Sequence, residues 1–181
     1  MMINQKGQSL VEVLIALGVA TIVVSAMAVA AITSVNNADF SKYQNVATQY
    51  AQEGIEVVRQ KSQTDWTTFR STYVGEAPDH PTGLVWCLDQ GTTMLDASPL
   101  SGCAKNIRDQ NSRLFFVRDV TLTATQFIAY TTPNVVHPAC NGTVQATVRV
   151  AWTDGKCSGP NDYCHAVVLN SCFTNLNTPG Q

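Results

Sequence analysis

The chain has 181 residues, a formal net charge of −2 and only 13% charged residues. This balance lacks the basic surface that a nucleic-acid-binding domain needs, so nucleic acid is not indicated as a partner. All six cysteines lie beyond the apolar N-terminal stretch, which favours disulfide bonds in an oxidising compartment.

The N-terminal stretch is apolar and long enough to cross a membrane. From Val13 to Ile32 there are twenty residues with neither a charge nor a proline. As a helix rising about 1.5 Å per residue, they span roughly 30 Å, the thickness of one hydrocarbon core. Lys6 precedes the stretch, and the positive-inside tendency therefore predicts a cytoplasmic leader with the rest of the chain outside the cytoplasm.

The residues at the start of this stretch read KGQSLVEVLIAL. This string resembles the prepilin signal of type IV pilins and pseudopilins, which are bacterial filament proteins. In that family a membrane peptidase cleaves after the glycine and methylates the new amino terminus. The resemblance implies cleavage between Gly7 and Gln8, N-methylation of Gln8, and an anchor that stays in the mature chain. The family most often has phenylalanine as its first mature residue, so glutamine here favours a minor subunit.

Glu12 is the one carboxylate at the edge of the apolar stretch. A carboxylate in this position costs a few kcal/mol unless it is paired or solvated. The resemblance identifies Glu12 with the family's glutamate, the fifth mature residue, which implies pairing with the amino terminus of a neighbouring subunit. The alternative is a solvated carboxylate in the headgroup layer that has no role in assembly.

A single helix is predicted from about Gln8 to about Lys61, some 54 residues or roughly 80 Å. Its first half, with residues 13–32 transmembrane, is expected in lipid, and its second half against a globular domain. Spacings of three and four residues predict one apolar stripe on the second half, made of Phe40, Tyr43, Ala47, Tyr50, Gly54 and Val57.

The rest of the chain is predicted to be a variable connecting region, 62–112, and a β-sheet domain with disulfides, 113–181. Proline and glycine punctuate the connecting region, where one short strand is expected near residues 83–88. Three strands follow in RLFFVRDVTLTA, TVQATVRVAWTD and HAVVLNSCF. The second alternates, which predicts one buried face formed by Val144, Ala146, Val148, Val150 and Trp152. The expected fold class is α+β and pilin-like, with one long N-terminal helix packed on a C-terminal antiparallel sheet.

The last two strands are expected to form a hairpin over residues 143–173, and two cysteines flank its tip. Cys157 and Cys164 can close that tip. One completion of this pairing joins the remaining four residues as Cys87–Cys103 and Cys140–Cys172. Six cysteines allow fifteen connectivities, so the pairing stays open at this point.

Candidate metal ligands and catalytic residues are sparse. No C-x-x-C pair is present, and His165 beside Cys164 lacks a second ligand pair, so zinc is not expected. Asp154 and Asp162 in the hairpin tip favour a solvated turn over a calcium site. The histidines are scattered along the chain and are interpreted as incidental (His80, His137 and His165). No nucleophile elbow or phosphate loop occurs, so neither an enzyme nor a cofactor is expected.

These patterns predict a structural subunit, a minor pilin or pseudopilin of a type IV pilus or a type II secretion-like filament. The resemblance implies several partners: other pilin subunits through the N-terminal helix, prepilin peptidase, the inner-membrane assembly platform, and lipid before assembly. The expected location is a single-pass inner membrane protein with its C-terminal domain outside the cytoplasm, and a filament after assembly. Two alternatives stay open: a tip-located adhesin or ligand-binding module, and a simple membrane-anchored extracellular domain.

Overall fold

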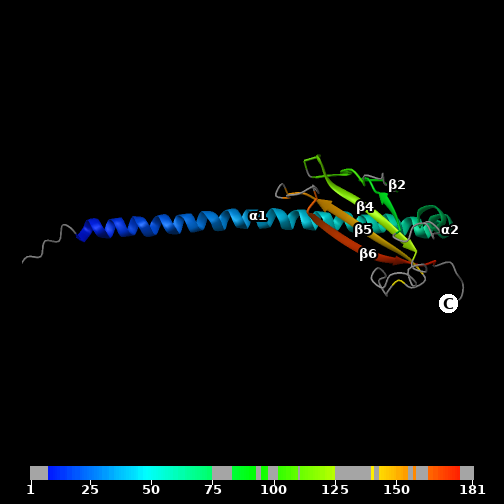
Figure 1. The fold of residues 1–181 in the computed structure, drawn as a ribbon, viewed down its shortest axis with the longest axis horizontal. Helices are drawn as coiled ribbons and strands as arrows, with labels where there is room; N and C mark the ends of the chain where they lie inside the picture. The colour runs from blue at the N-terminus through cyan, green and yellow to red at the C-terminus, as the bar shows by residue number, and fades with distance from the viewer. Residues whose placement is uncertain are drawn as a thin grey trace, which may run out of the picture. The chain divides into compact units, whose positions relative to one another are not determined.

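The computed structural model describes residues 8–74, 83–92, 95–97, 102–109, 111–124, 140, 143–154, 157 and 163–175 (Figure 1). The chain divides into two compact units, Met1–Tyr43 and Gln44–Gln181. The long helix α1, Gln8–Thr64, supplies the described part of the first unit and continues into the second. It ends at Thr64 rather than at the expected Lys61. The second unit also contains an antiparallel sheet, so the chain has the α+β, pilin-like arrangement that the sequence predicted.

The sheet has the strand order β2-β1-β4-β5-β6, with β3 also paired to β4. All pairings are antiparallel. The last two strands pair from Val144 opposite Phe173 to Trp152 opposite His165, which confirms the predicted hairpin. The strands are β1 Leu84–Cys87, β2 Asp96–Ala97, β3 Ile107–Arg108, β4 Leu114–Ala124, β5 Val144–Trp152 and β6 His165–Phe173.

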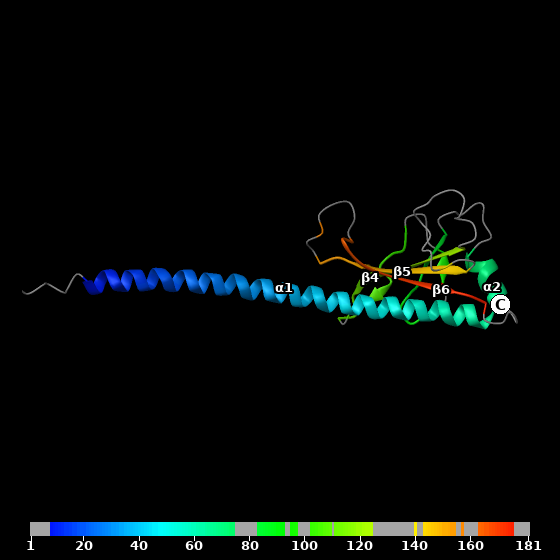
Figure 2. The same cartoon turned by 90° about the horizontal axis from the view of Figure 1, so that it is seen from below.

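The core of the second unit lies between this sheet and the C-terminal part of α1, which runs along one face of β4, β5 and β6 (Figure 2). Alternate residues of β5 supply much of it. Every member of the predicted apolar face of β5 is buried, and Trp152 is only 1% exposed (Val144, Ala146, Val148, Val150 and Trp152). The period-2 alternation of the sequence therefore identified the core face of this strand correctly.

The buried line on α1 differs in part from the predicted stripe. Ala47, Gly54 and Val57 are buried as expected, but Ala51 and Val58 are buried as well. Phe40, at the start of the predicted stripe, is 39% exposed. The line actually covered follows Ala47, Ala51, Gly54 and Val58, because a helix of about 3.6 residues per turn keeps these positions on one face.

Gly54 lets the helix approach the sheet closely. A Cβ atom at this position would lie 2.8 Å from Cγ1 of Val148 and 3.4 Å from Cδ of Arg118. A carbon contact of 2.8 Å is far inside ordinary van der Waals separation, so the side chain of β5 occupies the space that any larger residue would need.

The connecting region holds more regular structure than the sequence predicted. A short helix α2, Trp66–Phe69, follows α1 and passes into a π-helical turn η1, Arg70–Val74. Asp65 separates α1 from α2, because its backbone is extended and its side chain accepts a hydrogen bond from the backbone N–H of Thr68 at 3.0 Å. Capping of this kind satisfies a backbone donor at the start of a helix. The sequence pattern did not reveal this turn.

One edge of β4 is shared by β1 and β3. Between the partners contributed by these two strands, the side-chain amide of Asn106 takes the place of a strand residue. Its Oδ1 accepts a hydrogen bond from the Arg118 backbone N–H at 2.8 Å, and its Nδ2 donates to the Arg118 carbonyl at 2.9 Å. The backbone of β4 is therefore satisfied at the point where neither strand pairs with it.

Candidate functional site

The first unit presents an exposed apolar surface. Large apolar side chains from Leu10 to Val35 are exposed, and Ile22 is 70% exposed. The helix is long and apolar enough to cross a membrane, by length and composition. Uncovered apolar surface of this extent marks a site for lipid or for another protein.

Three hydroxyl groups in this segment are hydrogen-bonded within the helix itself. Thr21 donates to the carbonyl of Gly18 at 2.8 Å, Ser25 to the carbonyl of Thr21 at 2.7 Å, and Thr33 to the carbonyl of Val29 at 2.9 Å. Side chains bonded in this way do not require water. These three hydroxyl residues are thus compatible with an apolar covering.

Glu12 contrasts with these hydroxyl residues. It lies on α1 one turn after Gln8, the first helical residue, and its side chain is exposed. It is the only charged residue between Lys6 and Asp39. A carboxylate surrounded by apolar side chains needs a partner or water wherever the segment is covered. Gly7, the predicted cleavage residue, lies outside the described residues.

Arg118 is a buried charge that the sequence reasoning missed. It is 0% exposed and donates to backbone carbonyls of Tyr50 at 2.9 Å, Leu88 at 3.1 Å and Asp89 at 3.0 Å. Its Nη1 also lies 3.3 Å from Oε2 of Glu53 on α1. Burial lowers the pKa of Arg118 below its usual value, and the Glu53 carboxylate partly offsets this. The guanidinium group therefore joins α1 to the sheet.

A signal for this residue was present in the alternation of β4. Arg118 shares its strand face with Phe116, Val120 and Leu122, which are all buried. An arginine among such residues is either exposed to solvent, unlike its neighbours, or buried with partners that satisfy its charge. The partners come from segments distant in sequence, which no local pattern identifies.

The structure contains three disulfides, all in the second unit. They join Cys87 with Cys103, Cys140 with Cys172 and Cys157 with Cys164, the same pairing that the sequence analysis set out among the fifteen connectivities. The cysteines of the first two disulfides are 16 and 32 residues apart in the sequence. Those of the third are 7 residues apart and close the hairpin tip. Cross-links of this kind restrict the unfolded chain and stabilise the fold.

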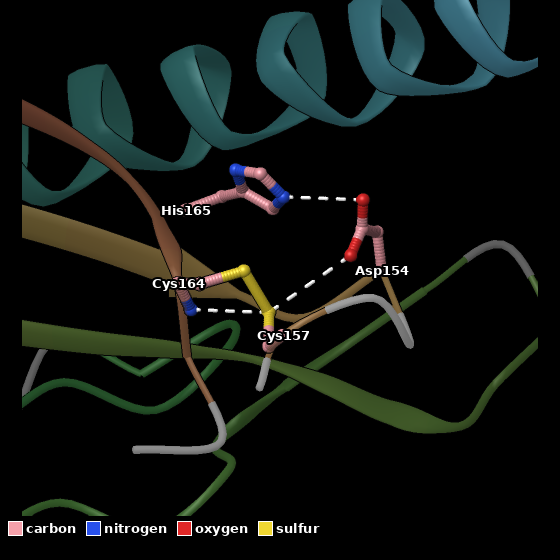
Figure 3. A group of neighbouring side chains, drawn as sticks. All are labelled: Asp154, Cys157, Cys164 and His165. Atoms are coloured by element: carbon pink, nitrogen blue, oxygen red, sulfur yellow. Dashed lines mark hydrogen bonds and ion pairs between the residues drawn. A yellow bond between two sulfur atoms is a disulfide. The ribbon is translucent and has the colours of Figure 1, made fainter. Parts of the chain in front are cut away.

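A group of potential ligand atoms surrounds the hairpin-tip disulfide (Figure 3). Nε2 of His165 lies 3.2 Å from Oδ2 of Asp154, and Sγ of Cys157 lies 3.9 Å from Oδ1 of the same carboxylate. The His165 ring packs against Trp152 with their centroids 5.5 Å apart. Zinc was not expected here because His165 beside Cys164 lacks a second ligand pair in the sequence, whereas the fold places Asp154 next to His165. In the disulfide form the two sulfur atoms are not thiolates, and thiolates are what bind zinc.

A cavity of about 280 Å³ lies at the end of α1. The ammonium group of Lys61 lies 5.2 Å from the centroid of the Tyr73 ring in its wall. Asp65 also lines it, and the hydrogen bonds from Thr68 lower the pKa of this carboxyl group. Its lining comes from α1, α2 and η1, so it appears only once the unpredicted turn has formed. Its lining residues do not belong to the loops that the disulfides close.

Four residues that the sequence singled out lie outside the described residues (Gly7, His80, His137 and Asp162).

The comparisons with known proteins concern the first unit. Residues 2–28 match the prokaryotic N-terminal methylation motif, the prepilin-type signal of type IV pilins and pseudopilins. No curated protein and no solved structure matches the chain. The matched residues include Gly7, Gln8 and Glu12 and most of the exposed apolar surface. The chain therefore carries the prepilin-type signal of type IV pilins and pseudopilins at the start of an α+β, pilin-like fold.

Proposed function

We propose that this protein is a minor pilin or pseudopilin, a structural subunit of a type IV pilus or a type II secretion-like filament. Prepilin peptidase cleaves it after Gly7 and methylates the new terminus at Gln8. The observation that carries the proposal is that the methylation motif coincides with an uncovered apolar helix. A soluble domain has no use for such a surface, whereas a subunit that moves from lipid into a helical bundle needs it in both states.

The apolar helix serves first as an anchor and then as an assembly surface. Before assembly, residues 13–32 lie in the inner membrane and the second unit lies outside the cytoplasm. The partners of this stage are lipid, prepilin peptidase and the inner-membrane assembly platform. During assembly, neighbouring subunits replace the lipid around α1. The back-bonded hydroxyls of Thr21, Ser25 and Thr33 need no partner in either surrounding.

Glu12 sets the axial position of the subunit in this scheme. Its carboxylate pairs with the methylated amino terminus of a neighbour, which is a cation once the leader has been removed. An unpaired carboxylate in a dry bundle is costly, so arrangements that leave Glu12 without a partner are disfavoured. The pair therefore contributes more to the specificity of assembly than to its overall stability.

The processing step is tested by intact-mass and N-terminal peptide analysis of the protein isolated from its host membrane. The expected product starts at Gln8, carries one additional methyl group and contains three disulfides. A chain that still starts at Met1 or Met2 would contradict the proposal and leave only an anchored extracellular domain.

The assembly step is tested with Glu12→Ala, with Glu12→Gln as the variant that keeps the shape and removes the charge. Both should stay in the membrane fraction but lose filament incorporation by about tenfold or more, because a buried unpaired group costs a few kcal/mol. Glu56→Ala is the matched control, since Glu56 is an exposed carboxylate on the same helix, paired with Arg59 at 2.9 Å. Normal incorporation of the Glu12 variants would remove the assigned role.

A further inference from the structure

We propose that Asp154, Cys157, Cys164 and His165 form a redox-gated zinc site at the end of the β5–β6 hairpin. The site is closed while Cys157 and Cys164 share a disulfide, and it opens to Zn²⁺ when that disulfide is reduced. This inference does not depend on the pilin assignment, because all four residues belong to the second unit.

The distances between the four groups suit a tetrahedral ion. Bonds of about 2.0–2.3 Å from zinc to nitrogen, oxygen and sulfur place neighbouring ligand atoms roughly 3.3–3.8 Å apart. The imidazole–carboxylate distance of 3.2 Å and the carboxylate–sulfur distance of 3.9 Å lie close to that interval. All four ligand atoms lie within 4.8 Å of one another. The covalent bond between the two sulfur atoms must break before they can take the separation that zinc requires.

The scaffold holds the ligands at one end of two paired strands. His165 is the first residue of β6, directly opposite Trp152 at the end of β5, and Asp154 follows two residues later. The Cα atoms of Cys157 and Cys164 are 5.4 Å apart, and Cys164 adjoins His165. Figure 3 shows the imidazole and the disulfide converging on the same carboxylate, one through Nε2 and the other through Sγ of Cys157. His165 thus belongs to a strand, while the other three ligands lie in the segment that joins the two strands.

The chemistry of opening is a thiol–disulfide exchange followed by metal binding. A dithiol reductant transfers two electrons and two protons to the Cys157–Cys164 bond, giving two thiols, and is itself oxidised to a disulfide. Zn²⁺ then displaces the two thiol protons to solvent. The ion is bound by two thiolates, one carboxylate and one neutral imidazole, which leaves the site with a net charge of about −1.

The other two disulfides do not offer the same site. Of the six cysteines, Cys157 and Cys164 are the two that belong to the described ligand group, which also contains a histidine and a carboxylate. Cys164 and Cys172 are both exposed, so the neighbouring histidine and carboxylate, rather than access to a reductant, distinguish the Cys157–Cys164 pair from the Cys140–Cys172 pair. The hairpin end is thus held by a disulfide under oxidising conditions and by a metal under reducing conditions.

The experiment uses the full chain in detergent, with and without a dithiol, titrated with Co²⁺ as a spectroscopic substitute for zinc and then with Zn²⁺. Reduced wild type should bind about one equivalent, with the visible absorption of tetrahedral cobalt and sulfur-to-cobalt charge transfer. Cys157→Ser/Cys164→Ser should lose this signal while keeping the other two cysteine pairs. His165→Ala and Asp154→Ala keep all six cysteines and should weaken binding by about tenfold or more.

Alkylation of the reduced protein with iodoacetamide, followed by peptide mapping, locates the metal. Zn²⁺ should protect Cys157 and Cys164 selectively over the other four cysteines. Equal protection of all six, or unchanged affinity in the His165 and Asp154 variants, would show adventitious thiol binding and overturn the site. Equally tight binding by the oxidised protein would overturn the redox gate.

Discussion

The two parts of α1, before and after the boundary at Gln44, use apolar residues in opposite ways. In the first part the large apolar side chains are exposed, as Ile22 is at 70%. In the second part small residues such as Ala47 and Ala51 are 0% exposed beneath the sheet. Hydrophobicity therefore indicates that a surface favours burial, but it does not indicate which part of the chain, or which other molecule, buries it. The second part is covered by the sheet, whereas the large apolar side chains of the first part are exposed.

The largest expected effect on stability comes from removing Arg118, the buried charge that joins the C-terminal part of α1 to the sheet. Arg118→Ala should lower the free energy of unfolding of the second unit by about 3 kcal/mol, because it leaves a cavity and removes donors from three backbone carbonyls. All three tryptophans lie in the second unit, so denaturant unfolding followed by tryptophan fluorescence reports on this unit alone.

Arg149→Ala is the matched control for this prediction. Arg149 also lies on a sheet strand and pairs with a carboxylate, Asp119, at 2.9 Å, but its side chain is 47% exposed. Asp119 is 13% exposed, so solvent reaches this pair mainly from the arginine, and its loss should cost less than that of the fully buried Arg118. Equal destabilisation by the two substitutions would show that burial of Arg118 does not matter to the attachment of the helix.

The next prediction compares the effects on stability of replacing two glycines of α1 by alanine. Gly54→Ala should destabilise the second unit by about 1 kcal/mol, because the clash with Val148 outweighs the gain in helix propensity. Gly18→Ala has nothing within 4 Å of the new Cβ, so it should leave tryptophan-monitored unfolding unchanged and increase local helix stability. Stabilisation by Gly54→Ala in the same assay would contradict the close approach of helix and sheet.

The smallest effect concerns the turn that ends the covered part of α1. Hydrogen bonds from Thr68 lower the pKa of Asp65 below its usual 3.8. The ionised carboxylate therefore stabilises the fold fully at pH values above the usual pKa of 3.8. This contribution is lost as the pH falls through the lowered pKa of the folded state. The difference in thermal unfolding midpoint between wild type and Asp65→Ala should shrink between about pH 5 and pH 2. A difference that stays constant over this range would show that the ionised carboxylate is not what stabilises the turn.

Much of the fold followed from local pattern. The period-2 alternation of β5 identified its buried face, because a strand puts successive side chains on opposite sides. The helical spacing after Tyr43 located the covered part of α1 but misassigned its exact line, since the sheet selects Ala51 and Val58 through contact. The α2–η1 turn was missed, because it depends on Asp65 capping Thr68 and on Trp86 donating to the Tyr73 carbonyl at 2.8 Å.

The sequence by itself determined the apolar N-terminal helix, the prepilin-type signal and the strands of the hairpin, because each rests on residues adjacent or periodic along the chain. Only the tertiary structure decided which charge is buried and which ligands meet. Arg118 finds its carbonyl partners 30 and 68 residues away, at Leu88 and Tyr50. Asp154 and His165 meet because β5 and β6 end together, which depends on the strand register. Contacts of this kind are set by pairing and packing across the whole domain, which no local pattern specifies.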